Sequence, residues 1–194
     1  MTSNTIVIVH GESERILVKD ISRRLRFPVE IYPEKGAGTV DLPNVASVLT
    51  GEPFDSEQSL HKYFPRLDYH PRRRVKMPDL KIFPIIDVDQ HGPFKKSFCS
   101  GDLFRDSVFR DRVIPIINDP DLDVILKRAG LDIDVRSKVR SYSEALVEAD
   151  YPALYEILKQ DGGTGLDQFL LRALGSCPPY QARFGEEYRR AFGG

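Results

Sequence analysis

Two short acidic stretches of the chain contain the residue types that bind divalent metal ions. In IFPIIDVD, an apolar run ends in Asp87 and Asp89. In TIVIVHGESERIL, another apolar run is followed by Glu12 and Glu14. Carboxylates are ligands that Mg²⁺ and Mn²⁺ prefer, and like charges placed close together are costly unless a cation joins them. The sequence therefore predicts a site for Mg²⁺ or Mn²⁺ built from these acids.

Both acidic stretches follow segments with the pattern of buried strands. Residues 5–9 and 82–86 are almost wholly apolar and rich in β-branched side chains, which is typical of strands covered on both faces. The carboxyl ends of parallel strands meet at one edge of an open sheet, where ligands bind. An acid after a strand is also a common cap of a turn or helix. Two acidic turns after two such strands favour the metal interpretation.

The rest of the chain supplies the elements that would hold these strands. Further strands are expected at 29–32 and 113–117, and each of the four is followed by a helical pattern, which favours a parallel sheet with right-handed crossovers. Ser13 is the expected N-cap of the first helix, and Asn118 or Asp119 that of the helix after the fourth strand. Helical patterns continue to the C-terminus, over about 134–148, 151–159 and 165–174. The predicted class is α/β, a Rossmann-like parallel sheet of about four strands between helices, with an α/β domain over 1–130 and a helical C-terminal extension over 131–194.

A basic segment interrupts this pattern at about residues 51–80, which contain four prolines and little periodicity. We expect an irregular insertion there. Its cations are interleaved with aromatic side chains, a pattern that can grip a nucleic-acid backbone and stack on bases. A charge run is more often a solvated face, which is the simpler interpretation here, and the position of the segment directly before the strand that ends in Asp87 is the argument for binding. The candidate nucleic-acid-binding residues are Arg72, Arg73, Arg74 and Lys76.

Composition describes an ordinary globular chain of 194 residues with a net charge of −1. Only two cysteines are present, Cys99 and Cys177, without CxxC spacing, so neither a disulfide framework nor a zinc site is indicated. No basic leader precedes an apolar segment, and no eighteen apolar residues run together, so we expect no signal peptide and no membrane partner. The expected compartment is the reducing cytoplasm.

The residues around both acidic stretches resemble the motifs of TOPRIM domains, which occur in topoisomerases, bacterial primases, recombination mediators and OLD-type or RloB-like nucleases. In VIVHGESERILVKDI, Gly11 and Glu14 match the glycine and the later acid of the first motif. IIDVDQHG matches the second motif, Asp-x-Asp after a strand, at Asp87 and Asp89. The resemblance implies a TOPRIM-like sheet in which these acids hold one or two cations on a phosphodiester.

Two further stretches resemble the OLD and RloB pattern. YPEKGAG is similar to the Gly-rich turn after their second strand and implies that Lys35 neutralises a phosphate, although a solvated loop lysine is the simpler interpretation. NDPDLDVIL resembles their Asn-Pro-x-Phe-Glu stretch and places Asp123 where that pattern has a glutamate, as a possible additional acid. The resemblance covers about residues 5–127.

One position departs from the family. TOPRIM enzymes have a glutamate directly before the glycine, and here that position is His10. Histidine can accept a proton, so His10 is a candidate general base, but it is a poor ligand for Mg²⁺, and it is also a common turn residue. Either Glu12 or Glu14 supplies the missing carboxylate, or the site has lost catalysis. The sequence leaves both open.

The resemblance implies a divalent-metal-dependent nuclease of DNA or RNA, with a setting in phage defence. The alternative is a catalytically degenerate module that binds nucleic acid or assembles with a protein partner or with further copies of itself. A nucleotide-binding protein of doubly wound type is a third reading, weakened because neither GxGxxG nor GxxxxGK[ST] follows Val9.

Overall fold

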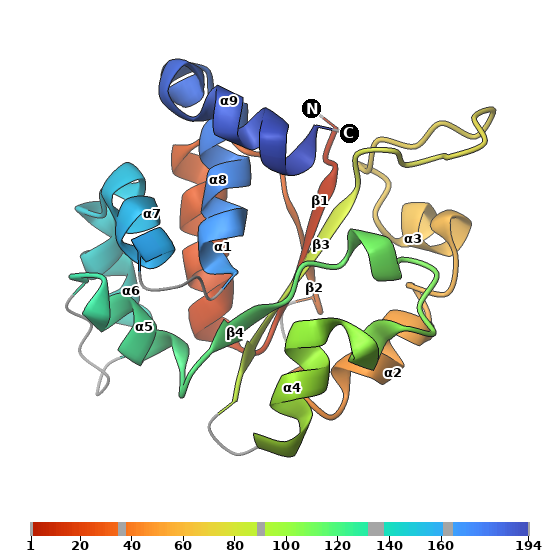
Figure 1. The fold of residues 1–194 in the computed structure, drawn as a ribbon, viewed down its shortest axis with the longest axis horizontal. Coiled ribbons are helices and arrows are strands. Elements are labelled where there is room, and N and C mark those ends of the chain that lie inside the picture. Colours follow the sequence, from red (N-terminus) through yellow and green to blue (C-terminus); the bar gives the residue numbers. More distant parts are fainter. Residues whose placement is uncertain (1, 35–37, 89–91, 132–137, 161–164, 194) are drawn as a thin grey trace. The chain divides into compact units, whose positions relative to one another are not determined.

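The computed structural model describes residues 2–34, 38–88, 92–131, 138–160 and 165–193. The chain forms an α/β fold and divides into two compact units (Figure 1). The sheet unit comprises Met1–Gly11 and Pro28–Pro120, and the helical unit comprises Glu12–Phe27 and Asp121–Gly194. The predicted domain boundary near residue 130 stays a prediction.

A four-stranded parallel sheet forms the centre of the sheet unit, which confirms the predicted fold class. The strands are β1 (Thr5–Val9), β2 (Glu30–Tyr32), β3 (Lys81–Asp87) and β4 (Ile116–Asn118), in the order β2-β1-β3-β4. All neighbouring pairs are parallel. The carboxyl ends of all four strands therefore lie along one side of the sheet, as the strand pattern predicts. This side is here called the carboxyl edge.

The fourth strand begins later than the sequence predicts because of two prolines. The register that pairs Ile85 with Ile116 places Pro84 opposite Pro115. Pro84 has no N–H group to donate toward β4, so the hydrogen-bonded ladder is interrupted at this level, and Pro115 lacks the N–H group on the outer side of β4. Val113 still forms an isolated bridge with Ile82, so the approaching segment is aligned before the strand itself begins.

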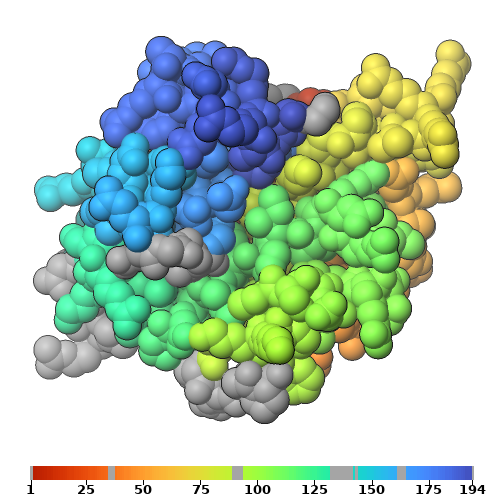
Figure 2. Space-filling view, viewed as in Figure 1, coloured from red at the N-terminus to blue at the C-terminus, as the bar shows by residue number. Residues whose placement is uncertain are grey.

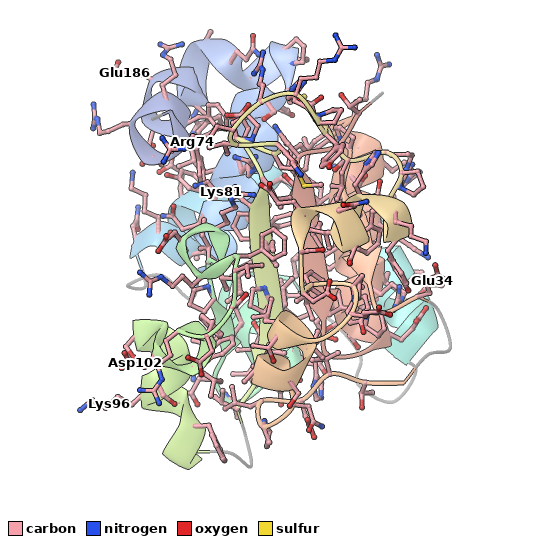
Figure 3. The ribbon with its side chains drawn as sticks, turned by 90° about the vertical axis from the view of Figure 1, so that its right-hand side faces the viewer. Glu34, Arg74, Lys81, Lys96, Asp102 and Glu186 are labelled. Atoms are coloured by element: carbon pink, nitrogen blue, oxygen red, sulfur yellow. The ribbon has the colours of Figure 1, made fainter. Side chains whose placement is uncertain are left out.

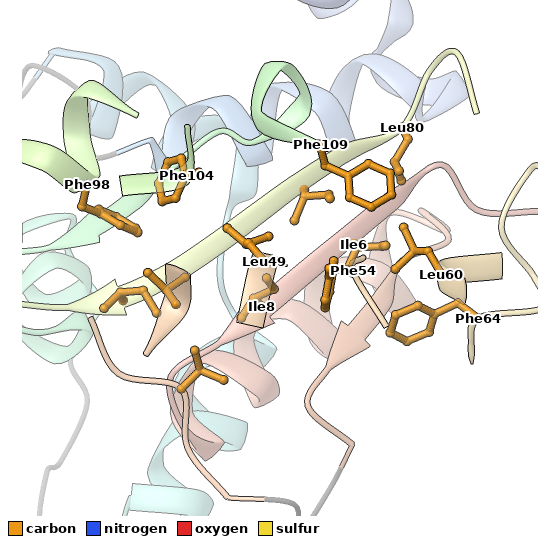
Figure 4. Close-up of a cluster of buried hydrophobic side chains, with 14 of the residues drawn as sticks. Ile6, Ile8, Leu49, Phe54, Leu60, Phe64, Leu80, Phe98, Phe104 and Phe109 are labelled. Carbon is orange, nitrogen blue, oxygen red and sulfur yellow. The ribbon is translucent and has the colours of Figure 1, made fainter. Parts of the chain in front are cut away.

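One face of the sheet packs on three helices of the same unit. These are α2 (Val45–Thr50), α3 (Glu57–Tyr63) and α4 (Gly92–Ser100), the last followed by the 3₁₀ turn η1 (Asp102–Phe104). Alternate residues of the two central strands point into this core, as the period of two of a strand requires. Aromatic side chains from the helices and turns fill it (Figure 4). Its largest members include Phe54, Phe98, Phe104 and Phe109, all at most 1% exposed.

The basic segment is more ordered than the sequence indicates. Within the stretch predicted to be irregular, α3 forms two turns of helix, and the hydroxyl of its N-cap Ser56 accepts a hydrogen bond from the backbone N–H of Ser59 at 3.1 Å. Leu60 anchors the helix in the core. A helix this short has little periodicity to detect, which explains the error.

The helical unit contains the first helix together with the C-terminal ones. Its helices are α1 (Glu12–Arg24), α5 (Leu122–Arg128), α6 (Lys138–Val147), α7 (Tyr151–Gln160), α8 (Leu166–Ser176) and α9 (Gln181–Phe192). α1 packs on α6 and α8, and α8 packs on α7 and α9. Arg24 of α1 donates hydrogen bonds to the carbonyl oxygens of Leu146 and Ala149, which tie the first helix to the end of α6.

Two helix starts differ from the expected caps. α1 begins at Glu12, so Ser13 lies inside its first turn. α5 is capped by Asp121, whose carboxylate accepts from the N–H of Val124 at 2.9 Å, so neither Asn118 nor Asp119 is its cap. Among the helices of the described residues, none combines the length and apolar character needed to cross a bilayer.

Candidate metal site at the carboxyl ends of the strands

The ends of β3 and β4 bring Asp87 directly opposite Asn118. The two residues are partners in the strand register, and Nδ2 of Asn118 donates a hydrogen bond to Oδ1 of Asp87 at 2.9 Å. The backbone of the same strand end is also fixed, since the N–H of Val88 lies 3.1 Å from the carbonyl oxygen of Asn118. A half-buried carboxylate is thus held in place at the edge where the metal is expected.

Asn118 is fully buried, and its hydrogen bonding is incomplete. An ionised carboxylate only accepts, so the amide must turn its Nδ2 toward Asp87. Its Oδ1 then remains, buried and without a hydrogen-bond partner in the described part of the chain. Such an atom carries a desolvation cost of about 1–3 kcal/mol unless something pairs with it. A hard cation is a suitable partner for an amide oxygen beside a carboxylate.

Sequence reasoning missed Asn118 as a site residue and took it for a possible helix cap. The signal was present, because a polar side chain ends the strand expected to neighbour the Asp-x-Asp strand. The pairing itself depends on the order of strands in the sheet, which the sequence does not specify locally.

His10 follows β1 at the same edge. Its backbone N–H lies 3.1 Å from the carbonyl oxygen of Ile85, and its ring Nδ1 lies 3.0 Å from the carbonyl oxygen of Val40. Because a carbonyl only accepts, Nδ1 carries a proton, and in the neutral ring the lone pair is on Nε2. The ring is therefore oriented, and Nε2 is the atom that can act as a base or ligand.

A cation that the sequence analysis did not select lies at this edge as well. Lys95 of α4 forms an ion pair with Asp119, the residue directly after β4. Both side chains are largely exposed, so the pair contributes little to stability. The pair places an ammonium group close to the end of β4, with its charge balanced by Asp119. The predicted cation Lys35 and the second acid of the pair, Asp89, lie outside the described residues.

The remaining predicted acids belong to the helical unit, where Glu14 and Asp123 gather around one phenol. The hydroxyl of Tyr142 donates to Asp123, and Glu14 is 2% exposed. Burial raises the pKa of Tyr142 far above its usual value, and the nearby charges of Asp123 and Glu14 raise it further. Tyr142 thus stays protonated and serves Asp123 as a donor. Glu12 is instead on the surface of α1, 3.4 Å from Nε of Arg15.

The structure thus brings Asp87 to Asn118, and Glu14 to Asp123, each pair within its own unit. A metal shared by Asp87 and Glu14 stays a prediction. Within the described ranges, no three His, Cys, Asp or Glu side chains form a metal-binding group by themselves. Asp89 lies outside these ranges.

The basic cluster lies at the opposite end of the sheet from Asp87. Residues 68–79, here called the basic loop, begin where Ser3 bridges to Leu67 and end where the N–H of Lys81 bonds to the carbonyl oxygen of Asn4. These contacts are at the amino ends of β1 and β3. Figure 3 shows Arg74 and Lys81 at that end, and Lys96 and Asp102 at the other. A strand of seven residues separates the two ends by about 20 Å.

Adjacency in the sequence therefore does not place this cluster beside Asp87. The basic loop does lead into the strand that ends in Asp87, but it joins that strand at its first residue. The loop projects from the surface (Figure 2), and Arg72, Arg73 and Arg74 are exposed, whereas Lys76 is half-buried. Nucleic-acid binding by these four residues stays a prediction, and a direct role beside Asp87 is not supported.

The fold and this edge define a class: an α/β protein with a four-stranded parallel sheet and a carboxylate–amide pair at its carboxyl end. Comparison with known protein families, with curated proteins and with solved structures finds no match.

Proposed function

We propose that the chain is a divalent-metal-dependent phosphodiesterase that cleaves nucleic acid. The observation that supports this most is the Asp87 carboxylate, held by Asn118 at the carboxyl edge of a parallel sheet. The segments ending in His10 and Asp87 resemble TOPRIM motifs, and this resemblance suggests metal-dependent cleavage of a phosphodiester as the reaction. The resemblance to OLD-type nucleases suggests a setting in phage defence. Fold by itself does not determine function, so the proposal depends on these residues.

Each residue has a role in the proposed reaction. Asp87 and Asp89, with Glu14 as a further ligand, would hold Mg²⁺ or Mn²⁺, and the ion would supply charge stabilisation at the attacking and leaving oxygens of the phosphodiester. The buried Oδ1 of Asn118 fits such an ion, because it is an unpaired hard oxygen beside Asp87. His10 would accept the proton of the attacking water at Nε2, and Lys95 or Lys35 would neutralise the phosphate.

A second function is favoured by the surroundings of His10. In the position where TOPRIM enzymes have a glutamate, this chain has a ring tied through Nδ1 to Val40. A histidine there is a poor ligand for Mg²⁺. The corresponding proposal is a module that has lost catalysis and binds nucleic acid, with a protein partner or in a homo-oligomer.

Incubation with plasmid, single-stranded DNA and tRNA in the presence of Mg²⁺ or Mn²⁺ tests the choice between the two functions. We expect cleavage of at least one substrate, lost on chelation and restored by the metal. Asp106→Asn is the control variant, because Asp106 is an exposed acid of the same unit that is not part of the proposed site, and it should cleave normally. Binding of nucleic acid without cleavage under any of these metals would favour the second function.

Asn118→Ala is expected to weaken Mn²⁺ binding about tenfold, because outer-shell partners of metal ligands typically contribute 10–100-fold. Removing the amide frees the Asp87 carboxylate to rotate and deletes the unpaired oxygen. Titration calorimetry of Mn²⁺ measures the change. Asn44→Ala is the matched control, since Asn44 is exposed and its side chain makes no capping hydrogen bond. Equal affinity for Mn²⁺ in the two variants would show that Asn118 does not contribute to metal binding.

A further inference from the structure

A hollow of about 470 Å³ lies beside the basic loop, far from Asp87. Three segments of the sheet unit line it: the start of α3, the basic loop, and the chain that leads into the 3₁₀ turn η2 (Arg110–Arg112). Its volume is within the range of about 300–1,000 Å³ typical of small-ligand sites. The hollow thus has the size of a site, and its lining indicates the ligand.

Positive charge dominates the lining. Arg74, Lys76 and Arg112 contribute three cations, against the carboxylates of Asp55 and Glu57. Glu57 forms an ion pair with Arg112 in which its Oε1 lies 2.9 Å from Nη2, but this buried oxygen accepts no hydrogen bond from any described residue. Arg74 and Lys76 form no ion pair with any described residue, and Lys76 instead lies over the ring of Tyr69 at 5.8 Å. Arg74 and Lys76 are therefore available to an anionic ligand, and the lining as a whole, with Asp55 included, has an excess of one positive charge.

Arg112 supplies the clearest sign of a missing acceptor. Its guanidinium is held by Glu57 on one side and lies over the ring of Phe109, 5.6 Å from the centroid. Its Nη1 is buried and has no hydrogen-bond partner within the described ranges. A charged donor left in that state is costly, and phosphate oxygens match the planar geometry of a guanidinium.

An apolar part of the lining completes the chemistry. Val75 and Val108 line the same hollow and are 47% and 65% exposed, which is unusual for valine. We propose that this hollow binds the phosphate monoester of a nucleotide, with the phosphate against Arg112, Arg74 and Lys76 and the sugar or base against the two valines. A phosphate monoester carries a charge of about −1.5 to −2 at pH 7, which matches the two unpaired cations.

This site is separate from the proposed metal site. The length of β3 places the two about 20 Å apart, so they would contact different phosphates. The inference therefore does not rest on cleavage, and the ligand has two possible sources: a free mononucleotide, or the terminal phosphate of a nucleic-acid strand.

Fluorescence anisotropy with the full chain tests the proposal and distinguishes the sources. The probes are one single-stranded oligonucleotide with and without a 5′-phosphate, labelled at its 3′ end, and AMP and inorganic phosphate are the competitors. We expect Arg74→Gln to weaken binding of the phosphorylated probe or of AMP at least tenfold. Arg105→Gln removes the same charge from an exposed residue of the same unit that does not line the hollow, and it should change the affinity for the phosphorylated probe less than threefold.

The outcomes separate clearly. Tighter binding of the phosphorylated than of the unphosphorylated probe would identify the ligand as the terminal phosphate of a strand. Binding of AMP, with equal affinity for the two probes, would identify the ligand as a free nucleotide. Equal losses of affinity in Arg74→Gln and Arg105→Gln would mean that the protein attracts the probe by nonspecific charge alone, and absence of binding by both AMP and the phosphorylated probe would overturn the proposal. The double variant Arg112→Gln/Glu57→Gln removes the ion pair without leaving a lone buried charge. It should lose the same phosphate preference while circular dichroism shows an intact fold.

Discussion

Asp87→Asn is expected to reduce metal-dependent cleavage at least a hundredfold while the protein remains folded. The substitution keeps the shape of the side chain and an oxygen that can still accept from Asn118, but it removes the negative charge. A bound metal contributes several kcal/mol to stabilising the charge of a phosphoryl-transfer transition state, and each 1.4 kcal/mol or so is a factor of ten in rate. Loss of a principal ligand should therefore cost at least two factors of ten.

The measurement is the initial rate of cleavage against Mg²⁺ concentration for the wild type, Asp87→Asn and the exposed control Asp106→Asn. We expect the Asp87 variant to show a lower rate that excess Mg²⁺ does not restore fully, and an unchanged circular dichroism spectrum. A rate within threefold of the wild type would show that Asp87 is not a ligand of a catalytic metal, even if cleavage itself is real.

The sheet could be predicted because its strands are buried apolar runs bounded by turns. Thr5–Val9 is buried at every position, and that environment leaves little choice of residue type. The residues at which the strands begin and end were less predictable. The start of β4 is determined by Pro115 lying opposite Pro84 on another strand, a relation that appears only once the register is known.

The candidate site was predictable to the extent that it follows from local sequence. Asp87 ends an apolar run, and the pattern alone placed it at the carboxyl edge. Asn118 and Lys95 depend on which strand and helix lie beside β3, so their contribution required the folded chain. The sequence places the basic loop directly before the strand that ends in Asp87, and only the folded chain shows that the loop lies at the amino end of that strand, away from Asp87.

The association of the first helix with the C-terminal ones was also beyond local patterns. α1 has a clear apolar stripe, but an amphipathic stripe does not identify its partner. In the structure Asp20 accepts a hydrogen bond from the hydroxyl of Tyr151 at 2.6 Å, and Arg24 bonds to carbonyl oxygens near the end of α6. These polar contacts join residues more than 120 positions apart in the chain.

Gly175→Ala should destabilise the helical unit by at least about 2 kcal/mol, although alanine is the better helix former. Gly175 lies in α8 where α9 crosses it closely. A Cβ atom added there would meet the Cβ of Tyr188 at 2.4 Å and its ring carbon Cγ at 2.7 Å. The obstructing atoms are next to the backbone of α9, so a change of rotamer cannot remove the clash, and the helices must separate.

Gly185→Ala is the matched control with the opposite sign. Gly185 lies inside α9, and an added Cβ would meet nothing closer than 3.8 Å. Here the lower backbone entropy of alanine in the unfolded chain and its helix propensity should add about 0.5–1 kcal/mol. Urea unfolding followed by circular dichroism should thus give a gap of about 3 kcal/mol between the two variants. Equal stabilities would mean that α8 and α9 do not pack in solution as they do in the structure.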